Sequence, residues 1–150
     1  MLKKFAVFVI FVLLSSGCDY SPIHSIKTNN IEIKIISMSG DKEINNYLSK
    51  ELEKKSKASS EKIDVIINTN FSKRVLAKDT KSFATDYELQ VIGDFELKKD
   101  DKSKTIKITE KFRYKNQNDN YEQKNYEKMI KLNLAQIIVS KLNLRINNFK

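Results

Sequence analysis

Apolar and polar residues alternate in four segments of the chain, and apolar residues recur at helical spacing in two others. Alternation puts every second side chain on one face of a strand, whereas a spacing of three to four residues puts apolar side chains on one face of a helix. The expected elements are, in order, a strand at residues 31–35, a helix at 43–57, strands at 63–75, 83–97 and 106–115, and a helix at 121–144. One apolar face per strand in the order β-α-β-β-β-α predicts an α+β two-layer sandwich, with a four-stranded, mostly antiparallel sheet packed on two helices.

The apolar face of each element predicts its share of the core. The last helix has the longest stripe, and Asn120 with Gln123 has the spacing of a pair that caps its N-terminus. Gly93 lies on an apolar strand face, where it would allow a bulge or the close approach of a helix. The strands are expected to bury, among others, Val75, Phe83 and Phe112, and the last helix Tyr126, Met129, Ile130, Leu134, Ile137, Ile138 and Leu142.

The first residues have the three parts of a secretory signal peptide. Lys3 and Lys4 precede an unbroken apolar run from Phe5 to Leu14, and small residues follow it. The run is shorter than the ~20 apolar residues that a membrane-spanning helix needs. The segment ending in Gly17 and Cys18 resembles a bacterial lipoprotein processing site, which implies cleavage before Cys18 and its acylation by fatty acids such as palmitate. Ordinary secretion is the alternative.

This processing divides the chain into three parts. Residues 1–17 are the expected signal peptide, residues 18–30 a lipid-attached tether, and residues 31–150 a single sandwich domain. Cleavage would lower the formal net charge of the chain from +9 to +7. A basic protein held on a membrane outside the cytoplasm is expected to meet anionic lipid or an acidic protein surface, and nucleic acid is not an expected partner.

The composition argues against an enzyme. The chain has one Cys, one His and three Gly, too few for a zinc site, an internal disulfide or a phosphate-binding loop. We expect no cofactor and no metal. His24 falls in the tether, and Asp86 and Glu88 share one strand face at a spacing that could support acid–base chemistry. Their expected lysine neighbours would keep both carboxylates ionised.

Opposite charges mark the polar faces of the last two strands, which indicates that these strands pair in an antiparallel sense. Cross-strand ion pairs explain these charges without a ligand site. The residues concerned are Asp86, Glu88, Asp94 and Glu96 on one strand and Lys107, Lys111, Arg113 and Lys115 on the next. The register of this pairing stays open, because the connection at residues 98–103 could shift it by two residues.

Basic residues near the expected loops form the candidate binding site. In an antiparallel sheet, the turn between the second and third strands lies at the same end as the end of the fourth strand. Together the residues could form one cationic rim that suits phosphate groups. An ordinary solvated lysine surface is the alternative. The candidates are Arg74, Lys78 and Lys81 beside that turn, and Lys115 and Lys124 beside the start of the last helix.

Three segments, in the same order along the chain, resemble the lipopolysaccharide-assembly lipoproteins (LptE). Residues 18–23, Cys-Asp-Tyr-Ser-Pro-Ile, are similar to the aromatic and proline residues that follow the lipidated Cys in that family. Residues 77–80 and 84–89 resemble its basic turn and the strand that follows. Residues 112–114, an Asn-rich loop and a helix through residues 137–142 resemble its C-terminal part.

The resemblance implies a function in binding and no reaction. Members of the family have a two-layer α/β sandwich, plug the LptD outer-membrane barrel and bind lipopolysaccharide. By the resemblance, Lys78 and Lys81 match the basic turn of the family, and Lys124 is a looser match. The expected location is the periplasmic side of the outer membrane, although Asp19 next to the Cys leaves retention in the inner membrane open. The alternative function is a periplasmic lipoprotein that scaffolds another envelope complex.

Overall fold

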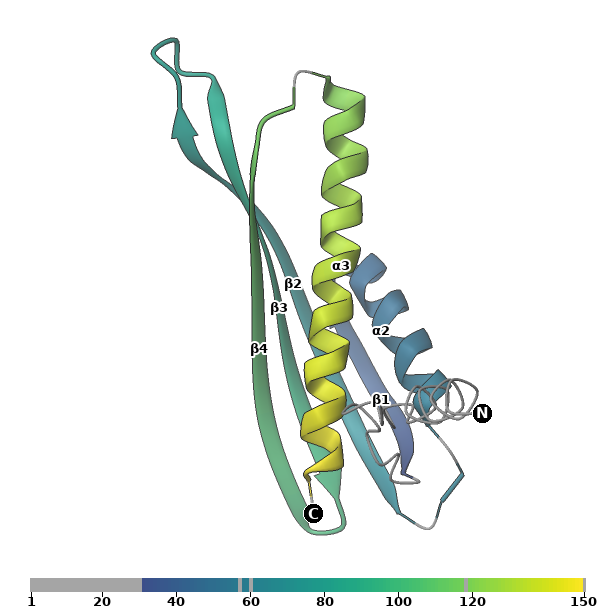
Figure 1. Cartoon of the computed structure of the whole chain (residues 1–150). Helices are drawn as coiled ribbons and strands as arrows, with labels where there is room; N and C mark the ends of the chain where they lie inside the picture. Colours follow the sequence, from purple (N-terminus) through teal and green to yellow (C-terminus); the bar gives the residue numbers. More distant parts are fainter. Residues whose placement is uncertain (1–30, 57, 60, 118, 150) are drawn as a thin grey trace, which may run out of the picture.

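The computed structural model describes residues 31–56, 58–59, 61–117 and 119–149. They form a four-stranded sheet with two helices on one face (Figure 1). The elements are β1 (Glu32–Gly40), α2 (Lys42–Lys55), β2 (Lys62–Lys78), β3 (Ala84–Lys99), β4 (Lys102–Lys115) and α3 (Asn120–Asn147). This order confirms the predicted α+β sandwich. The signal peptide, the lipid attachment at Cys18 and the tether fall outside the described residues.

The sheet is mixed, and its strand order follows the chain, β1-β2-β3-β4. β1 and β2 are parallel and α2 connects them, whereas β2–β3 and β3–β4 are antiparallel. Glu32 is opposite Lys62, so β1 begins at the end of the sheet where β2 also begins. β2, β3 and β4 are much longer than β1. The body is therefore elongated along these three strands (Figure 1).

The core lies between the sheet and the helices, where the alternating strand residues meet the helical stripes. α3 packs on β3 and β4, α2 packs on β1 and β2, and the two helices contact each other. Each large apolar side chain that leaves water here contributes about 1.5–3 kcal/mol. The fully buried apolar residues include Ile44, Leu48 and Leu52 of α2, Val65 and Ile67 of β2, Leu89, Val91 and Leu97 of β3, and Ala135, Ile138 and Leu142 of α3.

Several element boundaries differ from the prediction. β1 continues to Gly40, because main-chain pairing with β2 extends it through residues with no alternating pattern. The connection predicted at residues 98–103 is a two-residue turn, in which Asp100 has a φ of 51°. The predicted cap of α3 at Asn120 is wrong. Asp119 caps this helix, since its carboxylate accepts from the backbone N–H groups of Tyr121 at 2.6 Å and Glu122 at 2.9 Å.

Five residues expected in the core are exposed instead. Val75 is the last residue of β2 before its register shift, Phe83 lies in the β2–β3 turn, and the two side chains are 45% and 68% exposed. Phe112 is on the inner face of the edge strand β4 and is 41% exposed, although Ile108 and Tyr114 on the same face are buried. Met129 and Ile137 are 52% and 41% exposed on α3. A helix wheel puts both at the margin of the buried stripe, so the prediction made that stripe too wide.

Gly93 lies opposite Thr69 and Ile108 in an unbroken register, so the strand has no bulge at this position. Instead, the ring of Phe95 folds over the glycine. A Cβ atom at residue 93 would lie 2.5 Å from the Cζ atom of Phe95 and 3.4 Å from Cγ2 of Ile138 on α3. The predicted bulge is therefore absent, and the space beside Gly93 is filled mainly by the Phe95 ring of the same strand, with Ile138 of α3 at ordinary contact distance.

Candidate functional site

Four of the five candidate cations lie at one end of the sandwich, where the β2–β3 turn, the end of β4 and the start of α3 meet (Figure 1). Lys78 is the last residue of β2, Lys81 lies in the turn, Lys115 ends β4, and Lys124 is near the start of α3. Their side chains are exposed, and none forms an ion pair with another described residue. We call these four residues the cationic rim.

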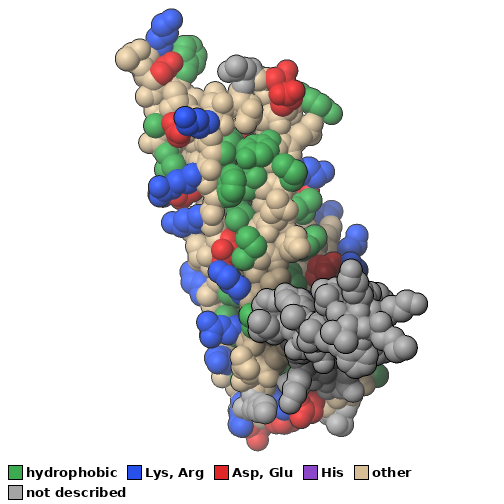
Figure 2. Space-filling model, in the orientation of Figure 1, with side chains coloured by type: hydrophobic (Ala, Val, Ile, Leu, Met, Phe, Trp, Pro, Cys, Tyr) green, Lys and Arg blue, Asp and Glu red, His purple; other side chains and the backbone are tan. Residues whose placement is uncertain are grey.

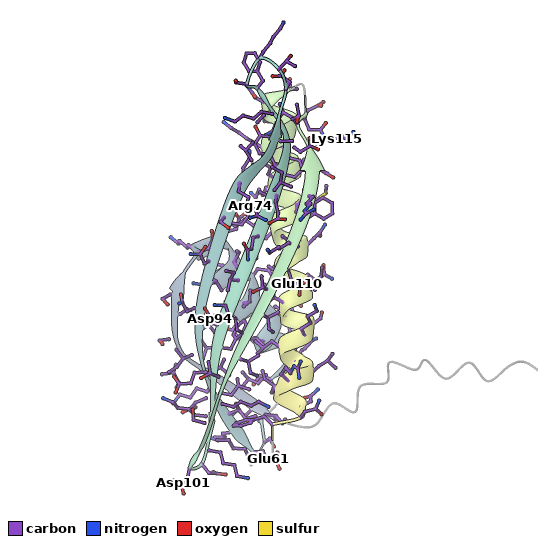
Figure 3. All side chains as sticks on the ribbon, turned by 90° about the vertical axis from the view of Figure 1, so that its left-hand side faces the viewer. Glu61, Arg74, Asp94, Asp101, Glu110 and Lys115 are labelled. Atoms are coloured by element: carbon purple, nitrogen blue, oxygen red, sulfur yellow. The ribbon has the colours of Figure 1, made fainter. Side chains whose placement is uncertain are left out.

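Arg74 differs from the other four cations. It lies within β2, opposite Glu88 of β3, and farther down the sheet than Lys115 (Figure 3). Its Nη2 atom is 2.7 Å from Oε1 of Glu88. The prediction that Arg74 belongs to the rim beside the turn is therefore wrong, because Arg74 lies within β2 and pairs with Glu88. The turn is farther from Arg74 than predicted, since β2 continues to Lys78.

Glu88 is the centre of a charge cluster on the sheet face that no helix covers. Besides Arg74, it contacts Nε of Arg113 at 3.0 Å and Nζ of Lys111 at 3.8 Å, and these side chains leave it 1% exposed. The hydrogen bond from Arg113 lowers the pKa of Glu88 against the opposing effect of burial. An ionised carboxylate with three cations does not supply a proton at neutral pH, as the sequence predicted for this residue.

The remaining outward charges follow the predicted cross-strand pattern. Asp94 is opposite Lys107, whose Nζ atom lies 3.6 Å from the carboxylate, whereas Asp86 is opposite Lys115 in the register but accepts a hydrogen bond from Thr85 Oγ1 at 2.8 Å and forms no ion pair with Lys115. Glu96 is an exception, because it lies opposite Thr105. These pairs stabilise the sheet by a few tenths of a kcal/mol each, about 0.2–1. The outward charges of β3 therefore have structural partners.

Asp79 shapes the tip of the rim. Its Oδ1 atom accepts from the backbone N–H of Lys81 at 2.9 Å and from that of Phe83 at 2.8 Å, and Ser82 adopts a φ of 68°. Because the Asp79 carboxylate bonds these backbone groups, the turn residues need no hydrogen bonds to a neighbouring strand, and their side chains stay outside the strand pairing. The tip consequently presents Lys78 and Lys81 beside the most exposed phenylalanine, Phe83.

A polar network closes the space between the sheet and α3 below the rim. Glu127 accepts hydrogen bonds from Tyr114, from Gln123 at 2.8 Å and from Lys73 at 2.6 Å. Burial raises the pKa of Glu127, but the hydrogen bonds from Lys73, Tyr114 and Gln123 outweigh it and hold this pKa below its usual value. Burial, together with the bond to Glu127, raises the pKa of Tyr114. The network thus binds α3 to β2 and β4 through a fixed negative charge.

A hollow of about 290 Å³ opens beside this network, next to the rim. Lys124 and Lys73 line it from α3 and β2, with Asn120, Gln123 and Glu127. Glu127 neutralises Lys73, so Lys124 is the cation that remains available there. A positive side chain beside amide donors suits a phosphate or carboxylate group.

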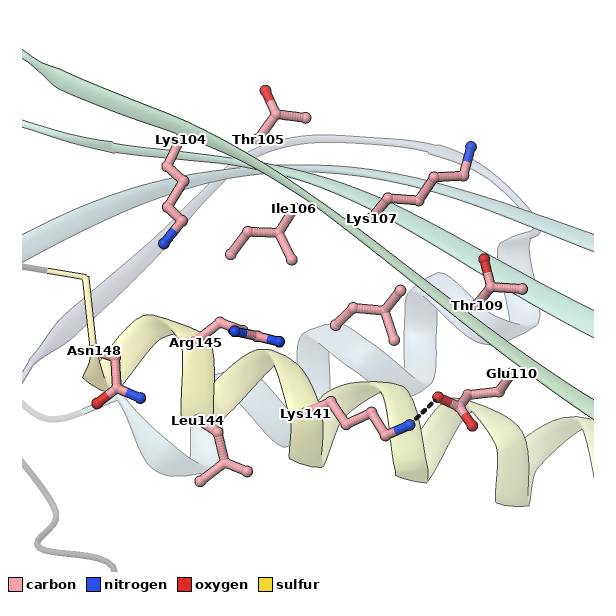
Figure 4. A pocket seen from close by; sticks show the side chains of 11 residues that line it. Lys104, Thr105, Ile106, Lys107, Thr109, Glu110, Lys141, Leu144, Arg145 and Asn148 are labelled. Carbon is pink, nitrogen blue, oxygen red and sulfur yellow. Dashed lines mark hydrogen bonds and ion pairs between the residues drawn. The ribbon is translucent and has the colours of Figure 1, made fainter.

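A groove of about 730 Å³ lies between β4 and α3, is larger than the hollow beside the rim, and was not predicted from the sequence (Figure 4). Its walls carry Lys104, Ile106, Leu144 and Arg145, among others. Leu144 gave no signal of the groove, because single exposed apolar residues are normal on protein surfaces. The depth of the groove itself depends on how α3 sits over an edge strand, which no local pattern encodes.

The described part of the chain has neither a candidate metal site nor a candidate membrane-spanning helix. No group of three or more His, Cys, Asp or Glu side chains there could hold a metal ion. The helices that the structure describes also include none with the length and apolar character of a membrane span. Cys18, Asp19 and His24 fall outside the described residues.

The fold is an elongated α+β sandwich that has the cationic rim at one end. Solved structures with a similar fold are bacterial lipoproteins. The rare lipoprotein B from Shewanella oneidensis superposes with a TM-score of 0.57 at 15% identity, over 80% of this chain and 98% of that one. An uncharacterized lipoprotein B from Nitrosomonas europaea gives 0.56 at 12% identity, over 80% and 86%. No protein-family model and no curated protein sequence matches the chain.

Proposed function

We propose that the protein is a lipid-anchored envelope lipoprotein that binds an LptD-type outer-membrane barrel and assists lipopolysaccharide transport and assembly. The observation that carries this proposal is the cationic rim with Phe83 at its tip. Four cations without ion-pair partners among the described residues favour an anionic ligand, and an exposed aromatic ring beside them favours one with an apolar part. The lipoprotein-like start of the chain and the fold shared with two bacterial lipoproteins support it.

The proposed mechanism is binding without chemical change. Lys78 and Lys81 meet lipid phosphates at the hairpin tip, while Phe83 contacts the apolar part of the lipid. Lys115 and Lys124 hold further phosphates beside the start of α3. The long strands and α3 form a stiff body that fits inside or against the barrel, with the acyl chains on Cys18 as its anchor. Arg74 is a weaker candidate than the other four, because it forms an ion pair with Glu88.

Lipopolysaccharide binding by the acylated chain in nonionic detergent tests the rim. We expect the triple reversal Lys78→Glu, Lys81→Glu and Lys124→Glu to weaken binding by at least about tenfold, since exposed ion pairs contribute ~0.2–1 kcal/mol each and the reversal adds repulsion. Added salt should weaken wild-type binding. The matched control reverses the exposed Lys42, Lys50 and Lys55 of α2 and should bind like the wild type.

Unchanged binding in the rim variant would favour the alternative, a periplasmic lipoprotein that scaffolds another envelope complex. The barrel partnership has its own test. Affinity purification from solubilised membranes, followed by mass spectrometry, should recover a large β-barrel protein, and repeated recovery of this chain alone would refute the partnership. Separation of inner and outer membranes on a density gradient tests the location. There, the Asp19→Ser variant reports whether Asp19 retains the chain in the inner membrane.

A further inference from the structure

β4 is an edge strand with unused main-chain groups. Within the described residues, no strand lies beyond it. The backbone N–H of Asn116 donates to the carbonyl of Thr85 at 2.7 Å, so even-numbered residues at this edge direct their main chain toward β3. Alternation then turns the N–H and C=O groups of the odd-numbered residues from 105 to 113 away from the sheet, since the β3–β4 register is unbroken. Such a row is a template for another strand.

The β4–α3 groove runs along the inner side of this edge. Lys104 from β4 and Arg145 from α3 project into it from opposite walls, and neither makes an ion pair with a described residue (Figure 4). Lys141 is instead neutralised by Glu110. Ile106 and the half-exposed Leu144 add apolar surface between the charges. On the same face, hydrophobic side chains gather in the upper part (Figure 2).

The charge of β4 indicates what can pair with it. Its only acidic residue is Glu110. A second copy of this chain would bring the cations of one β4 against those of the other, and like charges opposite each other destabilise strand pairs. An acidic strand would instead meet a strand with six cations and one carboxylate, although Lys107 already contacts Asp94, and Lys111 and Arg113 contact Glu88. The cations of β4 are Lys102, Lys104, Lys107, Lys111, Arg113 and Lys115.

We propose that β4 binds an acidic, extended segment of a partner protein, which adds to the sheet as a fifth strand. Its main chain pairs with the outward groups of Thr105, Lys107 and Thr109. Every second side chain of the segment then enters the groove, where a carboxylate meets Lys104 and Arg145. The inference goes beyond the proposed function, because it concerns the long edge of the sandwich and does not depend on the rim or on lipopolysaccharide.

A fluorescent decapeptide of alternating Glu and Val is the probe, and its anisotropy with the acylated full chain in nonionic detergent is the measurement. The Thr109→Pro variant removes one outward N–H and leaves pairing with β3 intact. We expect it to weaken binding by about tenfold or more, because proline also blocks the approach of a neighbouring strand. Replacing Lys104 and Arg145 with Gln should weaken binding by about fivefold to tenfold. The control Lys42→Gln with Lys50→Gln removes the same charge from α2 and should bind normally.

Two further measurements separate strand addition from diffuse attraction. The same peptide with methylated alternate backbone nitrogens keeps its charge but cannot pair, so it should not bind. When the unmethylated peptide is bound to the wild-type protein, it should slow amide hydrogen exchange at Lys107, Thr109 and Lys111. Equal binding of the methylated peptide, or equal weakening by the α2 control, overturns the proposal. The proposal is also overturned if the peptide does not bind and phosphatidylglycerol micelles instead slow amide hydrogen exchange in the groove. If circular dichroism shows that Thr109→Pro is unfolded, the proposal is tested by comparing the binding of the methylated and unmethylated peptides to the wild-type protein.

Discussion

The contact between Gly93 and Phe95 gives the sharpest stability prediction. The two residues share the inner face of β3, and the Phe95 ring covers the glycine at 1% exposure. A Cβ atom at residue 93 would lie 2.5 and 2.6 Å from two ring atoms, far inside van der Waals contact. Gly93→Ala must therefore displace the ring into a close-packed core that also contains Ile138. We expect the variant to be less stable than the wild type.

The magnitude follows from two opposing effects. Overpacking a core by one methyl group costs about 1–3 kcal/mol. Alanine also restricts the unfolded chain and fits a strand better than glycine, which returns about 0.5–1 kcal/mol. The difference is a net loss of free energy of unfolding of about 0–2.5 kcal/mol, and the middle of the two ranges gives about 1 kcal/mol. If Ala fitted without strain, the same substitution would increase stability.

Urea unfolding of the wild type and variant, followed by circular dichroism, measures this loss. A double-mutant cycle tests its cause, because Phe95→Leu removes the ring atoms that the new methyl group meets. In the Phe95→Leu background, Gly93→Ala should cost much less than it costs in the wild type. A stabilising Gly93→Ala, or an equal cost in both backgrounds, would contradict the proposed contact.

Two further predictions concern α3. Glu127→Gln should cost about 1–2 kcal/mol at neutral pH, because hydrogen bonds to the charged carboxylate are lost. The pKa of Glu127 lies below its usual 4.5 in the folded chain, so its charge stabilises the fold above that pH, and this contribution disappears as the pH falls through the folded pKa. Urea unfolding at several pH values should show the gap between wild type and variant narrowing below pH ~4.5, and a constant gap would contradict the assignment. Asp119→Ala should cost about 1 kcal/mol through loss of the cap, whereas Asn120→Ala should cost less. Equal losses of stability for the two variants in thermal unfolding would contradict the assignment of the cap to Asp119.

The order of elements and the face of each strand were predictable because local periodicity determines them. Leu89, Val91 and Leu97 alternate with charged residues and are fully buried. Opposite charges on neighbouring strands also predicted the antiparallel pairing, and Asp94 does lie opposite Lys107. These features depend on neighbours along the chain or directly across a strand pair.

Features that depend on register or on helix position were not predictable. Arg74 seemed to belong to a loop, because neither the length of β2 nor its alignment with Glu88 is written in a local pattern. The tight turn at Asp100 lies within a lysine-rich stretch that has the composition of a longer connection. Ile137 was assigned to the core because helical periodicity gives a direction but not the width of the sheet beneath the helix.

The parallel pairing of β1 with β2 has a consequence for geometry. Ile31 enters the fold at the end of the sheet opposite Lys78. β2 has 17 residues, and at about 3.3 Å per residue this separation is about 50 Å. A bilayer with its headgroups measures ~40–45 Å. The described fold is therefore long enough to place Lys78 a full membrane thickness away from Ile31, the first residue that the structure describes.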